Sequence, residues 1–348
     1  LNPGNVESVG MIKVGVVGCG GRGKGHAARL HAMENVELTG VCDIIKERAD
    51  ELAAKLSVPA LYDFHEFFAD VDVIWDCTRG FERAPVVIDS ANAGKHVFSE
   101  KPMGIDIESA DRLMAAIQRN GVKHSYCYSL HFTNPYKAAK AIFATGELGE
   151  LVSVWTRRYM PSDMRPRWYG DQSLSGGVIL DFQSHDLDLI CSFGGMPRTV
   201  FAHSDRIREG VKADEHAAVT MVFEKGMGFS EVSWWSPVGM SEFGVVGTKG
   251  SVIADGSGRV RKKLDGGEEE ILDVNAVTNV DLSGSIGERQ TDGSVRDLAS
   301  LNETPEQHFI RCVEQDLDPI VTPQMAYNVL KVVLAAQTSA DTGVSVNL

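Results

Sequence analysis

The first third of the chain alternates short apolar runs with stretches of helical periodicity, and this alternation constrains the fold more than any other feature. The apolar runs are rich in valine and isoleucine, which is typical of strands buried on both faces. Strands and helices in regular alternation imply right-handed crossovers and a parallel sheet covered by helices on both faces. The expected strands span residues 12–18, 36–43, 71–77, 95–100 and 122–128.

After about residue 130 the pattern changes to longer strands that follow one another with glycine turns between them. This predicts a mostly antiparallel sheet with helices on one face. A polar, glycine-rich segment at 262–303 predicts a long loop or an excursion at the sheet edge. The expected strands span residues 151–160, 216–225, 226–236 and 241–255, and helices that begin with Thr-Pro are expected at 304–315 and 322–340.

A glycine motif lies between the first expected strand and the first expected helix. Gly18, Gly20 and Gly23 form the pattern Gly-x-Gly-x-x-Gly, and Asp43 ends the next strand. A glycine motif between a strand and a helix, with an acid at the end of the next strand, is typical of a dinucleotide-binding loop. In such a loop the diphosphate binds the unpaired N–H groups at the helix N-terminus. The alternative is a glycine-rich turn that binds nothing. A carboxylate at Asp43 suits the ribose hydroxyls of NAD and repels the 2′-phosphate of NADP, so we expect NAD rather than NADP.

These patterns divide the chain into three parts. Residues 1–10 are expected to be a flexible leader, and residues 11–128 a doubly wound α/β domain of Rossmann type with a parallel sheet. Residues 129–348 are expected to form an α+β domain with a large open, mostly antiparallel sheet.

Composition narrows the possible partners and the compartment. The formal net charge of −14 argues against a nucleic acid or an anionic membrane as the main partner, since both favour basic patches. No apolar run approaches the ~20 residues needed to cross a bilayer. The six cysteines are scattered and form no Cys-x-x-Cys pair, so we expect a reduced cytoplasmic protein with no metal site.

The turn Glu100-Lys101-Pro102 follows the fourth expected strand. Ligands of such sheets bind beyond the carboxyl ends of the strands, so this turn is expected to border the nicotinamide. Proline restricts the residue before it to extended conformations, so Lys101 projects from a stiff position. A solvated lysine in an ordinary turn is the alternative.

The segment 176–190, "GGVILDFQSHDLDLI", is mostly apolar but contains several acids and a histidine. With the period of an α-helix, Asp181, Ser184, His185 and Asp188 share one stripe, while Asp186 points elsewhere. Asp181 and His185 are four residues apart, so the aspartate can orient the imidazole and stabilise its charged form, which suits a general base. A solvated helix face is the alternative.

Three motifs together resemble the glucose-fructose oxidoreductase / inositol dehydrogenase / MocA family. They are "GCGGRG", "AGKHVFSEKPMG" and "SGGVILDFQSHDLDL", and "GELGELVSVWTRR" and "GTKGSVIAD" resemble that family's second domain. The resemblance covers nearly the whole chain from Met11. It implies NAD(P)-dependent chemistry on a small sugar or polyol, and an open sheet in the second domain that makes the contacts of a homodimer or homotetramer.

The resemblance also implies roles for individual residues. His185 takes the proton of a substrate hydroxyl, Lys101 hydrogen-bonds the same oxygen, and Asp181 positions the substrate or His185. The expected cofactor-binding residues are Gly18, Gly20, Gly21, Arg22, Gly23, Asp43, Thr78, Glu100 and Lys101. The expected substrate-binding residues are Tyr128, His131, Arg158 and Trp168.

The chain departs from the pattern of its relatives after the third expected strand. Where they usually read Thr-Pro-x-x-x-His, Thr78 is followed by Arg79, and Arg83 replaces the histidine. Arg83 is expected either as an exposed helix residue or as a contact of cofactor or substrate. Trp75 and Asp76 are also unusual at the end of an apolar strand. In the loop before the 176–190 segment, Arg165, Arg167, Trp168 and Tyr169 either bind substrate or cover the cleft.

Three functions are compatible with these residues. The first is an NAD-dependent sugar or polyol dehydrogenase. The second is redox-neutral cleavage of a glycoside, with no net change in NAD, on the same scaffold. The third is a dinucleotide-binding regulator without turnover, which the presence of Lys101, Asp181 and His185 disfavours.

Overall fold

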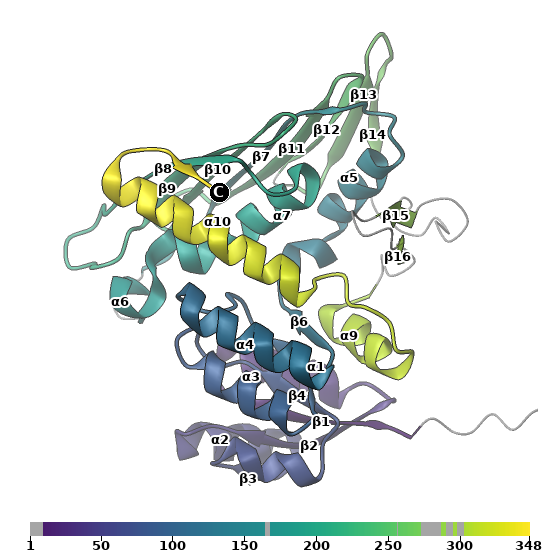
Figure 1. Cartoon of the computed structure of the whole chain (residues 1–348), viewed down its shortest axis with the longest axis vertical. Helices are drawn as coiled ribbons and strands as arrows, with labels where there is room; N and C mark the ends of the chain where they lie inside the picture. Colours follow the sequence, from purple (N-terminus) through teal and green to yellow (C-terminus); the bar gives the residue numbers. More distant parts are fainter. Residues whose placement is uncertain (1–9, 164–167, 256, 273–286, 290–294, 298–302) are drawn as a thin grey trace, which may run out of the picture. The chain divides into compact units, whose positions relative to one another are not determined.

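The computed structural model describes residues 10–163, 168–255, 257–272, 287–289, 295–297 and 303–348. The expected leader therefore lies outside the described residues, apart from Gly10. By their contacts the residues form two compact units (Figure 1). The first comprises residues 1–103, 108–127 and 305–323, and the second comprises residues 104–107, 128–304 and 324–348.

The first unit contains a six-stranded parallel sheet in the order β3-β2-β1-β4-β5-β6. This order is that of a doubly wound α/β fold, so the predicted fold class of this part is confirmed. The strands are β1 (Ile12–Val17), β2 (Val36–Cys42), β3 (Ala60–Leu61), β4 (Val73–Asp76), β5 (His96–Ser99) and β6 (His124–Tyr126). The helices between them are α1 (Gly21–His31), α2 (Lys46–Leu56), η1 (Phe64–Ala69), α3 (Arg83–Asn92) and α4 (Ile107–Asn120).

Helix α9 (Pro305–Glu314) belongs to the first unit, although the expected boundaries place it with the second. The reason is aromatic packing. Trp75 of β4 stacks on Phe98 of β5 with ring centroids 4.0 Å apart, and Phe309 of α9 lies 6.0 Å and 5.4 Å from these two rings. The apolar face of α9 thus completes the core of the parallel sheet.

The second unit is built on a nine-stranded sheet in the order β14-β13-β12-β11-β7-β10-β9-β8-β17. All its pairings are antiparallel except that of β7 with β10, which confirms the predicted mostly antiparallel sheet. The strands are β7 (Leu151–Tyr159), β8 (Thr199–Asp205), β9 (His216–Val222), β10 (Met227–Ser233), β11 (Met240–Gly247), β12 (Gly250–Ala254), β13 (Val260–Leu264), β14 (Glu269–Leu272) and β17 (Val346–Asn347).

One expectation for this sheet is corrected, and another is decided between its two alternatives. The run 241–255 is not one strand but the hairpin β11–β12, because the Gly247–Gly250 pair closes a turn at Thr248 and Lys249. The segment 262–303, expected as a long loop or an excursion at the sheet edge, begins within the antiparallel pair β13–β14 at the edge of this sheet, in agreement with the second alternative. It also contains the pair β15 (Gly287–Arg289) and β16 (Val295–Asp297). Its other parts, 273–286, 290–294 and 298–302, lie outside the described residues.

Helices cover one face of the nine-stranded sheet (Figure 1). They include α5 (Asn134–Ala144), α7 (Ser184–Gly194) and α10 (Pro323–Thr342). The opposite face, named here the open face, carries Phe201, Thr220, Phe229, Trp155 and Ile253 in one row of paired residues. Phe201 and Phe229 remain 45% and 38% exposed, so the open face presents large apolar side chains to the surroundings.

In the part of the chain that the structure describes, no helix combines the length and the apolar character needed to span a membrane. All six cysteines are free thiols, and four of them are buried.

Candidate active site

The glycine motif after β1 forms a tight loop whose glycines have separate physical reasons. Gly18 has a φ of 95°, and a Cβ on it would lie 2.8 Å from the carbonyl carbon and oxygen of Cys77. A Cβ on Gly23 would lie 1.7 Å from the carbonyl oxygen of Gly18. Helix α1 can therefore approach the strand closely only because residue 23 has no side chain.

The space above the motif is open. A Cβ on Gly20 or Gly21 would meet no atom within 4 Å, in contrast to Gly18 and Gly23. The N-terminus of α1 has no side-chain cap and no acid in its first turn. The uncapped helix N-terminus and the positive end of the helix dipole thus face a surface that a diphosphate can approach. Arg22, whose side chain is 66% exposed, pairs with Glu100 at 3.9 Å and adds a positive charge there.

Asp43, directly after β2, anchors this loop. One carboxylate oxygen accepts a hydrogen bond from the backbone N–H of Cys19 at 2.8 Å, and the other accepts one from the N–H of Ile45 at 2.8 Å. Each oxygen keeps a second lone pair, so Asp43 can still accept hydrogen bonds from a ribose diol. The residues therefore fit the adenosine and diphosphate parts of NAD.

A buried ion network that the sequence analysis missed surrounds Glu100. The imidazole of His26, in α1, is hydrogen-bonded to Glu100 at 3.0 Å and to Glu306 of α9 at 2.6 Å, and Arg29 donates to Glu306 at 2.5 Å. The available signal was a histidine on the apolar face of α1, beside the buried Ala27 and Leu30.

The network keeps Glu100 ionised. Burial alone would raise the pKa of Glu100, but the hydrogen bond and charge of His26, and then the charges of Arg22 and Lys101, lower it to about 2. Burial alone would lower the pKa of His26, and its bonds to Glu100 and Glu306 raise it instead. Glu100, next to Lys101 in this turn, is therefore an ionised carboxylate at neutral pH.

The same place is the one gathering of metal-ligand residue types among the described residues: His26, Glu100 and Cys127. Both nitrogens of His26 are already engaged by glutamates, and burial raises the pKa of the Cys127 thiol well above its usual range. An imidazole without a free nitrogen and a protonated thiol make a poor metal site. The cluster is better explained as an ion network.

At the ends of β4 and β5 the predicted residues Thr78 and Lys101 lie in turns. Thr78 donates to Asp76 from its backbone N–H at 2.9 Å and from its hydroxyl at 2.5 Å. Lys101 is partly buried, and its peptide bond to Pro102 is cis. Arg83 is fully buried, so the alternative of an exposed helix residue is wrong, and its side chain donates to Asp76, Thr78 and Pro102.

In the second unit, the segment 176–190 is helical but irregular. Gly176 and Gly177, with φ of 69° and 73°, precede the π-helix η4 (Ile179–Gln183), and α7 begins at Ser184. Asp181 thus lies in a π-helical turn rather than on the regular α-helical wheel that the spacing predicted, and His185 lies in the first turn of α7. Single π-turns inside helices are rare and recur at functional sites.

The alternative of a solvated helix face is wrong, because every residue from Ser184 to Ile190 is buried. His185 is 6% exposed, and Asp186 and Asp188 are at most 1% exposed. Acids this deep require partners. Asp186 takes a two-pronged contact from Arg158 at 2.8 and 2.7 Å, and Asp188 is 2.6 Å from the Nε2 atom of His131.

Of the four predicted substrate residues, two contact acids and two make ring contacts. His131 and Arg158 hold the acids of α7, while the ring of Tyr128 meets that of His185 edge-on at 5.9 Å. Trp168 packs against Tyr169 with ring centroids 4.1 Å apart. Their contact with substrate remains a prediction, and Arg165 and Arg167 lie outside the described residues.

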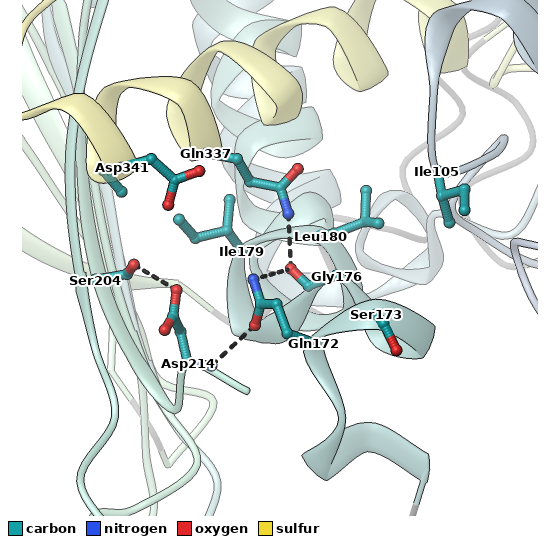
Figure 2. A pocket seen from close by; sticks show the side chains of 11 residues that line it. Ile105, Gln172, Ser173, Gly176, Ile179, Leu180, Ser204, Asp214, Gln337 and Asp341 are labelled. Atoms are coloured by element: carbon teal, nitrogen blue, oxygen red, sulfur yellow. Dashed lines mark hydrogen bonds between the residues drawn. The ribbon is translucent and has the colours of Figure 1, made fainter. Parts of the chain in front are cut away.

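A cavity of about 260 Å³ lies beside the start of the π-helix (Figure 2). Its polar groups bind one another: Gln172 and Gln337 both donate to the carbonyl oxygen of Gly176, at 3.3 and 2.7 Å, and Ser204 donates to Asp214 at 2.6 Å. Asp181 and His185 are not among its lining residues. These bonds brace the turn that precedes the π-helix.

The doubly wound sheet, the open glycine loop and the uncapped helix N-terminus define the first unit as a dinucleotide-binding domain of Rossmann type. Residues 12–128 match the model of an oxidoreductase family with an NAD-binding Rossmann fold, and residues 136–253 match the GFO/IDH/MocA C-terminal domain. The chain therefore belongs to the GFO/IDH/MocA family of NAD-binding oxidoreductases, as its motifs predicted.

Known relatives agree with this assignment. The chain is 28% identical over 254 residues to myo-inositol 2-dehydrogenase of Thermotoga maritima, which covers 70% of this chain and 75% of that protein. It is 27% identical over 256 residues to 2,7-anhydro-N-acetylneuraminate hydratase of Escherichia coli, covering 70% and 68% of the two chains.

Solved structures share the fold across the whole length. GenD2 from gentamicin A biosynthesis, in complex with NAD, superimposes with a TM-score of 0.79 at 23% identity, covering 100% of this chain and 99% of that chain. The WlbA dehydrogenase from Bordetella pertussis, in complex with NADH and UDP-GlcNAcA, gives a TM-score of 0.81 at 20% identity, covering 97% and 98%.

Proposed function

We propose that this protein is a dehydrogenase that oxidises a hydroxyl group of a sugar, an inositol or a related polyol with NAD. The observation that carries the proposal is the buried His185 on a helix whose neighbouring acids are held by Arg158 and His131. An imidazole shielded from water and fixed in place is suited to proton abstraction. The similarity to a myo-inositol 2-dehydrogenase supports the polyol class of substrate.

In the proposed reaction NAD, when bound, supplies the acceptor for the hydride that leaves the substrate carbon. His185 takes the hydroxyl proton, so the C–O single bond becomes a carbonyl and both hydrogens are accounted for. Lys101 donates a hydrogen bond to the same oxygen and stabilises the negative charge that develops there. Asp181 orients His185 or the substrate.

The preference for NAD over NADP rests on Asp43. Its carboxylate lies where the adenosine ribose binds in such loops and would repel a 2′-phosphate. Lys46 and Arg48 follow closely in the chain and reduce this repulsion. We expect a higher kcat/KM with NAD than with NADP, measured with one substrate at saturating concentration.

The decisive test is NADH formation by the purified protein with NAD and a panel of sugars, inositols and sugar acids. His185→Ala serves as the blank. Absorbance at the NADH band that rises with the wild type and not with the blank establishes the dehydrogenase. Silence across the panel, together with tight NAD binding, contradicts it.

Redox-neutral cleavage is the second candidate, because one relative is named as a hydratase rather than as a dehydrogenase. It predicts release of product from an anhydro sugar or a glycoside while NADH stays constant. A protein that binds NAD but changes no substrate in either assay is the third candidate, a regulator.

We also propose that the open face joins copies of the chain into a homodimer or homotetramer. It presents the aromatic side chains of Phe201, Phe229 and Trp155, of which the first two are 45% and 38% exposed. Phe229→Glu is expected to reduce the mass in light scattering, while the exposed Val344→Glu leaves it unchanged. Equal masses for both variants and the wild type contradict the proposal. The free thiols support our expectation of a cytoplasmic location.

A further inference from the structure

Arg83 is the residue whose position departs most from its expected surroundings. It occupies the first position of α3, where an arginine is ordinarily exposed, yet its side chain is 0% exposed. A buried guanidinium is costly unless charges and hydrogen bonds compensate it. The groups that compensate it here all come from the carboxyl ends of two neighbouring strands.

The guanidinium makes three directed contacts. Its Nε donates to the carboxylate of Asp76 at 2.7 Å, one terminal nitrogen donates to the carbonyl oxygen of Thr78 at 2.5 Å, and the other donates to the carbonyl oxygen of Pro102. The planar fork of arginine reaches these separate acceptors at once, whereas a lysine presents a single point charge.

Asp76 extends the same set of bonds. It is also 0% exposed, and its second oxygen accepts from the N–H and the hydroxyl of Thr78. Its carbonyl oxygen accepts from the N–H of Glu100 at 2.8 Å. One buried ion pair therefore joins the turn after β4, which carries Thr78, to the turn after β5, which carries Lys101.

We propose that Arg83 is a positioning residue that fixes the main chain on either side of Lys101 and Thr78. The two turns lie at the edge of the sheet where ligands of parallel α/β sheets bind. Arg83 itself is enclosed by protein and acts through the residues that it holds. The catalytic consequence rests on the proposed dehydrogenase function, while the joining of the two turns does not.

The structural arm of the test needs no substrate. Amide hydrogen exchange is followed by mass spectrometry in the protein without added ligand, in wild type, Arg83→Lys and the control Arg198→Lys. Arg198 also donates to a backbone carbonyl, that of Phe223 at 3.0 Å, but in the second unit. We expect Arg83→Lys to accelerate exchange in peptides covering 77–82 and 100–104, and Arg198→Lys to leave these peptides unchanged.

The functional arm separates positioning from binding. A displacement of about 1 Å at a reacting group can cost on the order of 100-fold in rate, so kcat of Arg83→Lys is expected to fall by about 10- to 100-fold. The KM for NAD is expected to change less than kcat, because Gly20 and Asp43, which are expected to bind the diphosphate and the ribose, are untouched. Asp76→Asn, which keeps the volume and removes the charge partner, is expected to give the same pattern if Arg83→Lys folds poorly.

The two arms distinguish the possible failures. Unchanged exchange in the two turns of both variants overturns the proposal, and so does faster exchange with unchanged kcat. If Arg83→Lys exchanges faster in the two turns but the wild-type protein forms no NADH, the proposed function is wrong while the joining of the two turns by Arg83 stands. Equal losses with the Arg198 control also contradict a specific role for Arg83.

Discussion

The glycine loop after β1 and the helix α7 are built in different ways, one from backbone geometry and the other from contacts between buried side chains. The loop uses backbone: glycines admit close approach at Gly18 and Gly23, and the space at Gly20 beside the uncapped helix N-terminus stays open. Helix α7 uses side chains, buried from Ser184 to Ile190, with Asp186 and Asp188 held by partners from other elements. The first design needs only a local sequence pattern, and the second needs residues brought together by the whole fold.

This difference predicts how each region fails. In a loop built from backbone, a substitution disrupts the fold wherever a Cβ has no room. Where the space is open, a substitution leaves the fold intact but weakens ligand binding. A helix held by buried ion pairs loses stability when one partner is removed, because the other charge is left without compensation. The following variants test the contrast in order of decreasing expected effect.

Gly23→Ala is expected to have the largest effect. Its Cβ would lie 1.7 Å from the Gly18 carbonyl, so strand and helix must separate. We expect the free energy of unfolding to fall by about 4–5 kcal/mol and NAD binding to disappear in titration calorimetry. Gly20→Ala is the matched control, with an unchanged unfolding midpoint and weaker NAD binding. Normal binding by both variants would refute the assignment of this loop.

Arg158→Met removes the partner of Asp186. Breaking a buried pair costs about 3–5 kcal/mol, so urea unfolding is expected to shift to clearly lower concentration. Arg259→Met serves as the comparison, because Arg259 pairs with Asp255 on the surface, where ion pairs contribute little. Similar midpoints for the two variants would show that α7 does not depend on this pair.

Lys101→Met is expected to lower the rate of the reaction rather than the stability of the fold. Loss of a donor to a developing oxyanion costs about 10²- to 10³-fold in kcat. Since Lys101 is only partly buried, the unfolding midpoint is expected to change little. Steady-state NADH formation and thermal unfolding are measured on the same preparation. A kcat within a factor of two of the wild type would exclude Lys101 from the reaction.

The His26 network predicts a smaller effect that depends on pH. His26 has a raised pKa in the folded protein, so its contribution is complete below its usual value of 6.5 and is lost as pH rises through the folded pKa. Glu100, held at about 2, contributes above its usual 4.5 and loses this contribution only as pH falls towards 2. We expect His26→Gln to lower the free energy of unfolding by about 1–3 kcal/mol near pH 5.5 and by less near pH 9. A pH-independent difference between the two proteins would contradict the charged network.

The same contrast explains what the sequence could predict. The parallel sheet and the glycine loop follow from neighbours in the chain, so periodicity and spacing were sufficient. The partners of Asp186 and Asp188 lie 28 and 57 residues away in the sequence, and no local pattern indicates them. The burial of Arg83 had one signal, an aspartate at position 76 in an otherwise apolar strand. The sequence of that strand alone could not identify Arg83 as the partner of this aspartate.

The remaining differences also have non-local causes. The amphipathic pattern of α9 was visible, but only the aromatic pair of Trp75 and Phe98 decides which sheet it covers. The π-helical turn at Asp181 changes the wheel on which the sequence analysis relied, and no residue type specifies it. The glycines at 247 and 250 did contain the signal for the hairpin that was expected as one strand.

The return of α9 to the first unit has a consequence for synthesis on the ribosome. The parallel sheet is translated first, but Phe309 and Glu306, which complete its core and its ion network, are translated after roughly 180 residues of the second unit, at about 5–20 residues per second. For about 10–40 s the nascent sheet has to wait with the surface around Trp75 and Phe98 uncovered. The part of the chain that begins to fold first is therefore among the last to be finished, and it is during this interval that a chaperone would find its binding surface.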